Sequence, residues 1–445
     1  MRRQAEAKAT ATAALVLGVV LVAGAFLGLE AGVEPFATWF YVFAWAGTLL
    51  AADGVVALGG GPPGAQRGRF LLLSRPAFLI SLFAWSALHW LFFELLNFRL
   101  RNWYYVFLPS ERATRWVGTL LSFGTVLPAI LTAETLLAQR RFAERVRWPR
   151  LAVTPALLRA LPVAALVMLA LMMLAPRVFF PLVWGVLTLW LEPFVYRRAP
   201  ERSLLGDLEA GRPARVLRLL AGGLGVGLFW ELYNIRARTK WIYTVPGLEE
   251  LKLFEMPLLG FLGFAPFALD CFVVWQALVV ARLAVPRLAV PGLRIAPRRV
   301  AVSLACALPF CALVLAGMER WTIASYRPRL SAIVGAGAGV ALQRAELDAF
   351  SLAAARPRRV AELTGADARQ AARWIERARL ATLRGIGTEN ARLLERVGIG
   401  SVEALAAARP GIVVARLRSA GCDPVPARVR VWVRAARRAT DRPVS

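Results

Sequence analysis

Residues 93–105 read FELLNFRLRNWYY, and residues 230–243 read WELYNIRARTKWIY. The two stretches share Glu, Asn, two Arg, Trp and Tyr in the same order, with one extra residue before Trp241. Agreement at this many polar and aromatic positions indicates an internal duplication, and a duplicated stretch marks a repeated structural unit. The repeat therefore predicts that the chain is built from two related modules.

The two copies also match outside this motif. A tryptophan followed eight positions later by an acid ends at Asp53 in the first copy and at Glu192 in the second. Glu134 and Asp270 occur in the apolar segment that follows each motif. Each module then contains four apolar segments. An even number gives both modules the same orientation, as in the parallel repeats of some transporters.

The apolar segments predict membrane spans. Hydrophobic residues make up 58% of the chain, whereas soluble domains are about 45–50% apolar, and a spanning helix needs about 20 apolar residues. Residues 330–342 are apolar but short, so a tenth span there is left open. We predict an all-α polytopic transmembrane bundle with nine spans, at roughly residues 12–29, 38–58, 76–97, 116–137, 161–174, 178–196, 216–234, 256–280 and 300–318.

Arginines between the predicted spans set an orientation. Residues 67–75, 140–159 and 282–299 hold three, six and five Arg with a single Glu among them, and cytoplasmic loops are enriched in such residues. Much of the net charge of +27 is attributed to this anchoring, with contact to anionic lipid or nucleic acid as alternatives. We expect a multi-pass protein of the bacterial inner membrane with a cytoplasmic N-terminus. A cytoplasmic terminal domain, also expected, requires the tenth span.

Four regions follow from these boundaries. The first module covers residues 1–158, the second 159–298, and the ninth and open tenth spans 299–343. An Arg-rich helical domain covers residues 344–445.

The terminal domain contains a glycine-turn pattern. Residues 383–391 read LRGIGTENA, in which the glycines permit a tight turn and Thr388 can cap the following helix, and LAAARP occurs at both 352–357 and 405–410. This arrangement resembles the tandem helix-hairpin-helix domains of an uncharacterised bacterial family. The resemblance implies phosphate contacts from the backbone of Gly385, Ile386 and Gly387. Docking of a protein is the alternative, which the acids at 389 and 395 favour over nucleic acid.

The duplicated motif carries the candidate binding site. Glu94 and Asn97 share one helix face because they lie three residues apart, and an acid within a span is costly enough to mark function. Its arginines would hold an anionic headgroup or small anion by two parallel hydrogen bonds. The structural alternative is an ion-paired helix end with an aromatic belt. The candidates are Glu94, Asn97, Arg99, Arg101, Trp103, Tyr105, Glu231, Asn234, Arg236, Arg238, Trp241 and Tyr243.

Other acids provide a second hypothesis. Asp53, Glu134, Glu192 and Asp270 would line a polar pathway, or would lie at helix ends, which suits Asp53 and Glu134 better. The single histidine, His89, and four cysteines without a CxxC pair predict no metal site. We expect no cofactor.

Three functions remain open from the sequence. The first is recognition of an anionic lipid or small anion at the duplicated site, for transport or membrane assembly. The second is a membrane enzyme without assigned catalytic residues, because residues 246–250, PGLEE, resemble the Pro-x-Glu-Glu element of membrane lycopene (carotenoid) cyclases. That resemblance implies isoprenoid-lipid chemistry, and a phospholipid is the other substrate of this enzyme alternative. The third is a membrane tether for the terminal domain, with a protein partner or, less favoured, nucleic acid.

Overall fold

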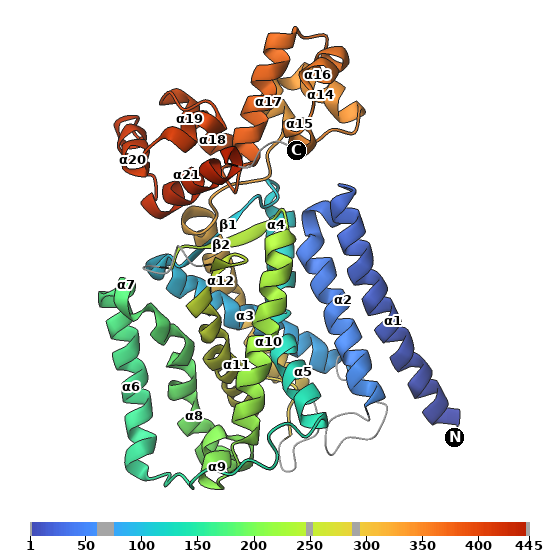
Figure 1. Cartoon of the computed structure of the whole chain (residues 1–445). Coiled ribbons are helices and arrows are strands. Elements are labelled where there is room, and N and C mark those ends of the chain that lie inside the picture. Colours follow the sequence, from blue (N-terminus) through green and yellow to red (C-terminus); the bar gives the residue numbers. More distant parts are fainter. Residues whose placement is uncertain (1, 60–74, 246–251, 287–293, 442–445) are drawn as a thin grey trace. The chain divides into compact units, whose positions relative to one another are not determined.

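A computed structural model describes residues 2–59, 75–245, 252–286 and 294–441, which are predominantly helical (Figure 1). Its internal contacts divide the chain into two compact units. The helical unit comprises residues 1–102, 116–238 and 245–320. The terminal unit comprises residues 103–115, 239–244 and 321–445. Two short segments from the middle of the chain thus belong with the C-terminal region.

The helical unit contains nine helical segments, among the described residues, that are long and apolar enough to cross a membrane. Their number agrees with the nine segments predicted from hydropathy. The elements are α1 (Arg2–Glu30), α2 (Phe36–Leu58), α3 (Pro76–Leu100), α4 (Arg112–Phe123), α5 (Val126–Gln139), α6 (Pro155–Leu174), α7 (Pro176–Phe179), η1 (Phe180–Gly185), α8 (Val186–Arg198), η2 (Pro200–Arg202), α9 (Leu204–Glu209), α10 (Ala214–Arg236), β3 (Lys252–Leu253), β4 (Met256–Pro257), η3 (Leu258–Gly263), α11 (Phe264–Val280) and α12 (Pro297–Trp321).

Small residues bring α1 and α2 together along most of their length (Figure 1). A Cβ atom added at Gly18 would lie 2.5 Å from the backbone nitrogen of Ala51, and one at Gly54 would lie 2.7 Å from that of Leu15. The two backbones therefore approach too closely for any larger side chain at these glycines. Such small-residue contacts are typical of helices that pack within a bilayer, where close approach replaces the hydrophobic effect.

One apolar segment is interrupted between α4 and α5. The Ser86 hydroxyl of α3 donates to the Phe123 carbonyl at 2.7 Å and accepts from the Leu127 amide at 2.9 Å. It thereby forms hydrogen bonds with backbone groups that have no partner within the helix at the break. Such replacement is what an interrupted helix needs in an apolar environment.

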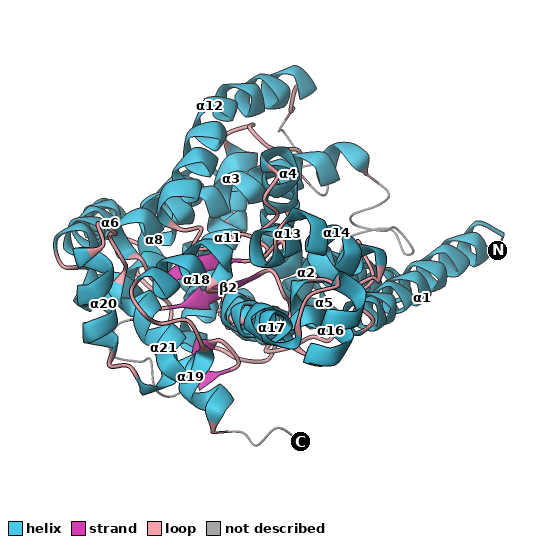
Figure 2. Ribbon diagram, turned by 90° about the horizontal axis from the view of Figure 1, so that it is seen from above, coloured by secondary structure: helices cyan, strands magenta, loops and turns pink. Residues whose placement is uncertain are grey.

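The terminal unit begins with a small sheet. Strands β1 (Trp103–Val106) and β2 (Lys240–Tyr243) pair antiparallel, with Trp103 opposite Tyr243 and Tyr105 opposite Trp241 (Figure 2, magenta). The chain after α12 extends this sheet. The Tyr105 amide donates to the Thr322 carbonyl, and the Ala324 amide donates to the Tyr105 carbonyl, each at 2.8 Å.

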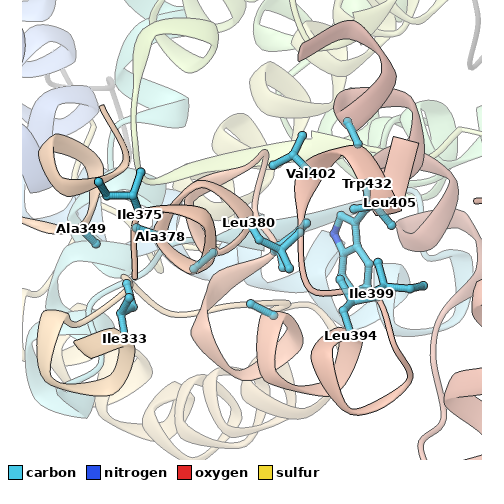
Figure 3. Packing of buried hydrophobic residues seen from close by; sticks show 14 of the residues in the cluster. Ile333, Ala349, Ile375, Ala378, Leu380, Leu394, Ile399, Val402, Leu405 and Trp432 are labelled. Atoms are coloured by element: carbon cyan, nitrogen blue, oxygen red, sulfur yellow. The ribbon is translucent and has the colours of Figure 1, made fainter. Parts of the chain in front are cut away.

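Nine helices complete the terminal unit among its described residues. Leu380 lies between two groups of core side chains, Ile333, Ile375 and their neighbours on one side and Leu394 and Trp432 on the other (Figure 3). One continuous core therefore joins the successive helix pairs. The helices are α13 (Leu330–Val334), α14 (Ala336–Arg344), α15 (Ala349–Ala353), α16 (Pro357–Thr364), α17 (Ala368–Thr382), α18 (Gly387–Arg396), α19 (Val402–Ala407), α20 (Pro410–Ser419) and α21 (Pro426–Thr440).

Residues 330–342, the possible tenth span, form two short helices. Residues 330–342 form α13 and most of α14, separated at Gly335, whose φ of 89° interrupts the helix. Leu330, Ile333 and Leu342 are buried in the core of the terminal unit. The apolar character of this stretch is therefore explained by burial in a folded core, and the continuous helix that a span requires does not form.

Candidate functional site

Glu94 is fully buried in α3 of the helical unit. Its Oε1 accepts a hydrogen bond from the indole nitrogen of Trp90 at 3.1 Å. Trp90 lies one turn earlier on the same helix, so the two side chains share a face. The structure thus brings an indole donor to this carboxyl group.

Asn97 closes the C-terminal end of α3. Its side-chain oxygen accepts from the Asn102 amide at 2.9 Å, and its carbonyl accepts from the Arg101 amide at 2.8 Å. Arg101 adopts a φ of 55°, the left-handed conformation common where helices end. In the first copy, the Asn of the motif therefore shapes the chain as it leaves the helix.

The second copy places Glu231 and Asn234 in α10, where both are fully buried. Glu231 lies close enough to Tyr41 of α2 to interact with it electrostatically. One residue from Asn234, the Tyr233 hydroxyl is 2.7 Å from the Thr48 hydroxyl of α2. Neighbouring aromatic rings reinforce this contact, with Trp45 and Trp230 centroids 5.9 Å apart.

The arginines of the motif lie away from the helix interior. Arg99 and Arg101 are exposed, and Arg238 is partly exposed. Arg236 is also exposed and forms an ion pair with Glu30. Solvent-exposed pairs of this kind contribute little to stability. The buried carboxyl groups and exposed guanidinium groups thus occupy different environments within the helical unit.

The Trp and Tyr residues of the motif lie in the terminal unit. Each Trp faces the Tyr of the other copy across the β1–β2 ladder, and Tyr104 pairs with Ile242, its aligned equivalent, at the centre. Aromatic pairs across strands are stabilising contacts in a sheet. The duplicated motif is therefore divided, with its acids and amides in one unit and its Trp and Tyr in the other.

The four remaining acids have separate local roles. Glu192 accepts from the Ser203 hydroxyl at 2.5 Å and the Leu205 amide at 2.8 Å, at the start of α9. Asp270 of α11 is fully buried and accepts from the Thr188 amide at 2.7 Å.

The other two acids lie on α2 and α5. Glu134 forms an ion pair with Arg218 at 2.9 Å. Asp53 is only 1% exposed and lines a cavity of about 200 Å³ between α2, α3 and the α4 region. Of the proposed pathway residues, Asp53 thus has an observed cavity beside it.

The glycine turn between α17 and α18 is buried within the terminal unit. Gly385 and Gly387 have φ values of 82° and 74°, and Ile386 is fully buried. A Cβ atom at Gly385 would lie 2.4 Å from Val106 of β1, and one at Gly387 would lie 2.5 Å from Ser325. The turn therefore packs against β1 of the small sheet and against Ser325. A phosphate contact at these residues would require that packing to open.

Further contacts hold the sheet to the terminal helices. The Asn390 side chain donates to the Ala324 carbonyl at 3.0 Å. The Arg428 guanidinium lies 4.9 Å from the ring centroid of Tyr104 and donates to the Trp321 carbonyl at 2.8 Å. A cation over an aromatic face is attractive. These contacts thus join Tyr104 of the first inserted segment, and the chain at residues 321–324, to the terminal helices.

Two further expectations from the sequence concern a metal site and residues 246–250. The described residues contain no cluster of three or more His, Cys, Asp or Glu arranged to hold a metal ion. Residues 246–250, which carry the cyclase resemblance, lie outside the described residues.

Comparison with known proteins identifies the C-terminal region. A family model described as a domain of unknown function, DUF4332, matches residues 347–438. The C-terminal region therefore contains a domain of the uncharacterised DUF4332 family, and the resemblance to helix-hairpin-helix domains stays a prediction. Curated proteins and solved structures give no match to the chain.

Sequence reasoning missed several residues around these sites. Trp90, Tyr41 and Thr188 are common residue types in apolar helices and lie outside the duplicated pattern. Val106 and Ser325 contact the glycine turn from distant parts of the chain. The spacing of Trp90 four residues before Glu94 was the one available signal, because such residues share a helix face.

Proposed function

We propose that the chain is an integral membrane protein whose paired outer loops hold its DUF4332 domain, as a membrane-anchored docking module. The supporting observation is that β1, β2 and residues 321–445 form one compact unit. In this proposal, the duplicated Trp and Tyr residues have a structural role. They pair the loop of one module with the loop of the other, and the DUF4332 domain packs on that pair.

The order of the apolar helices supports this arrangement. Four of the nine candidate spans lie between β1 and β2, and two lie between β2 and residue 322. An even number of crossings returns the chain to the same side of a membrane. All three segments of the terminal unit would therefore emerge on one side, as a single folded unit requires.

The arginine distribution selects that side. The basic stretches 140–159 and 282–299 fall in the alternate connections, which the positive-inside rule assigns to the cytoplasm. With nine spans and a cytoplasmic N-terminus, the DUF4332 domain lies outside the inner membrane. This proposal replaces the expected cytoplasmic location of the terminal domain, which would have required the open tenth span.

The proposed partner is an acidic protein of the cell envelope. Residues 344–445 contain 20 Arg and 10 acidic residues, a formal charge of +10. Oppositely charged surfaces attract and orient one another during association. On the outer side of the inner membrane, a protein partner suits this charge better than nucleic acid does.

Paired glycine substitutions test the docking of the domain on the loops. Gly385 and Gly398 share a φ of 82°, but a Cβ at Gly398 meets no atom within 4 Å. Both Ala variants carry backbone strain, whereas only Gly385→Ala also collides with Val106. We expect Gly385→Ala to destabilise the terminal unit by about 1–3 kcal/mol more than Gly398→Ala, the usual cost of overpacking.

Limited proteolysis of the full-length protein measures this difference. Faster cleavage within residues 321–441 is expected for Gly385→Ala than for Gly398→Ala. Equal cleavage of the two variants would mean that the turn does not rely on Val106, and the docking proposal would then fail.

Recognition of an anionic lipid is a second candidate, favoured by the exposure of Arg99 and Arg101 at the end of α3. Guanidinium groups bind phosphate by paired hydrogen bonds. The Arg99→Gln/Arg101→Gln double variant should lower retention of phosphatidylglycerol in native mass spectra, relative to a control changed at Arg358 and Arg359. Unchanged retention would remove this candidate.

A further inference from the structure

The LAAARP repeat of the terminal unit has a matching structure. In both copies this segment is followed by two further helices, α16 and α17 in the first and α20 and α21 in the second (Figure 1, orange and red). Arg379 donates from Nε to the Ala353 carbonyl at 3.2 Å, and Arg437 donates from Nε to the Ala406 carbonyl at 3.0 Å. Each arginine follows a tryptophan by five residues, and each acceptor is the second residue of LAAARP. The sequence repeat is thus also a repeat of local structure.

A glycine turn of the same pattern precedes each copy. Residues 333–341 read IVGAGAGVA, and residues 383–391 read LRGIGTENA. Both stretches have glycine at the third and fifth positions and alanine at the ninth. Gly335 and Gly385 occupy the third position, and their φ values of 89° and 82° are both left-handed. The turn before α14 is therefore the counterpart of the turn before α18.

These two turns differ in what lies against them. The covered turn, residues 385–387, packs so closely on Val106 and Ser325 that a Cβ atom at either of its glycines would collide. At the open turn, residues 335–337, a Cβ atom at either glycine would meet no other part of the described chain within 4 Å, and all three residues are exposed. An extended segment of the same chain thus occupies one turn, whereas within the described residues no such segment lies against its counterpart.

A basic side chain lies beside the open turn. The exposed guanidinium of Arg392 donates to the Ala332 carbonyl at 2.7 Å, just before the turn. Arg377 donates to the Ile333 carbonyl at 3.1 Å, but it is also paired with Glu395 at 2.7 Å. The attraction for an acidic group at this turn therefore comes chiefly from Arg392, and charge of this kind orients an oppositely charged partner.

We propose that the open turn binds an extended segment of the acidic partner protein. The segment takes the place that β1 has at the covered turn, and a β-branched side chain packs against Gly335 and Gly337 as Val106 packs against Gly385. Glycine permits this close approach because it has no Cβ atom. An acidic residue of the segment lies beside Arg392. The covered turn specifies the extended form of the ligand, whereas the class of partner rests on the proposed docking function.

Hydrogen–deuterium exchange of the full-length protein in lipid nanodiscs tests the proposal with a defined probe. The probe is a short synthetic peptide with Tyr-Val-Phe, the order of residues 105–107, between glutamates. In the control peptide, Asp replaces the central Val. With the probe at about ten times its Kd, exchange of the amides at residues 335–338 should slow about tenfold, because the turn is then free in about a tenth of the molecules. The control peptide at the same concentration should leave exchange unchanged.

A matched pair of glycine variants locates the bound peptide. Gly337 and Gly411 are each the second residue of a helix, and a Cβ atom at either would have open space around it. Both Gln variants should therefore fold and unfold at the same temperature. Gly337→Gln should weaken binding of the probe about tenfold, as loss of a strong interface contact does, and Gly411→Gln should leave binding unchanged. Equal binding by the two variants would overturn the assignment to the open turn.

Other ligands give different results in the same experiment. Equal protection by the two peptides would show that charge alone drives binding, and protection by a DNA duplex but by neither peptide would assign the turn to phosphate. Either result, or no protection by the probe, would overturn this inference alone. The docking of the domain on the loops is tested separately by Gly385→Ala, whose outcome does not depend on residues 335–337.

Discussion

Equivalent acids of the two copies lie beside aromatic side chains. Glu94 accepts a hydrogen bond from Trp90 on its own helix, and Glu231 lies near Tyr41 of α2. Asn97 closes the end of α3 through the Asn102 amide. The sequence predicted these positions as a binding site, which stays a prediction; the structure shows that Glu94, Asn97, Glu231 and Asn234 are buried. Trp90 and Asn102 are local neighbours that spacing could indicate, whereas the proximity of Glu231 to Tyr41 depends on packing between distant helices, which spacing alone does not predict.

Glu111 provides a pH-dependent contribution outside the apolar helices. Hydrogen bonds from the Thr114 side chain, and then from the Thr114 and Ala113 amides, lower the pKa of this carboxyl group below its ordinary value of 4.5. A lowered folded-state pKa means that its stabilising contribution is present above the unfolded-state pKa. The contribution is lost as the pH falls through the folded-state pKa.

We therefore expect Glu111→Gln to make the terminal unit less stable than the wild type near neutral pH. The difference should shrink as the pH falls below about 4.5, the ordinary glutamate value. Thermal unfolding of the two proteins across this pH range measures the difference. A gap that stays constant into acid would rule out ionisation of Glu111 as its source.

The pairing of β1 and β2 is a feature that hydropathy could not reveal. The Trp and Tyr positions were predicted as a ligand site or an aromatic belt, and the structure places them opposite one another across a two-stranded ladder. Strands of four residues each are too short to stand out in a sequence of long apolar helices. Pairing between loops more than 100 residues apart depends on the tertiary fold.

Cysteine cross-linking tests this pairing. Trp103 and Tyr243 are opposite in the ladder, whereas Lys240 is opposite Val106. The Trp103→Cys/Tyr243→Cys pair should form a disulfide on mild oxidation, because directly opposite residues have Cα atoms about 5 Å apart. The Trp103→Cys/Lys240→Cys pair is offset by three positions, about 10 Å along the strand. Equal cross-linking of both pairs would contradict the register.

At the scale of the chain, much of the helical organisation could be predicted. Hydropathy predicted nine apolar segments, and nine such helical segments occur among the described residues. The predicted domain boundary at residue 344 stays a prediction, and the compact terminal unit has wider bounds. Residue 344 marked a change in composition, but the unit begins at Trp321 and includes two segments from far earlier in the chain. Composition along the sequence cannot reveal a unit assembled from separated segments.

In the topology that we propose, the DUF4332 domain lies on the outer side of the membrane with the loops that hold it. Cys422 is partly exposed in the terminal unit, whereas Arg150 lies in a basic connection assigned to the cytoplasm. In intact spheroplasts, a membrane-impermeant maleimide should label a protein that keeps only Cys422. A cysteine-free protein carrying Arg150→Cys should be labelled only after the membrane is permeabilised. Labelling of Cys422 that likewise requires permeabilisation would place the domain in the cytoplasm and contradict the proposed topology.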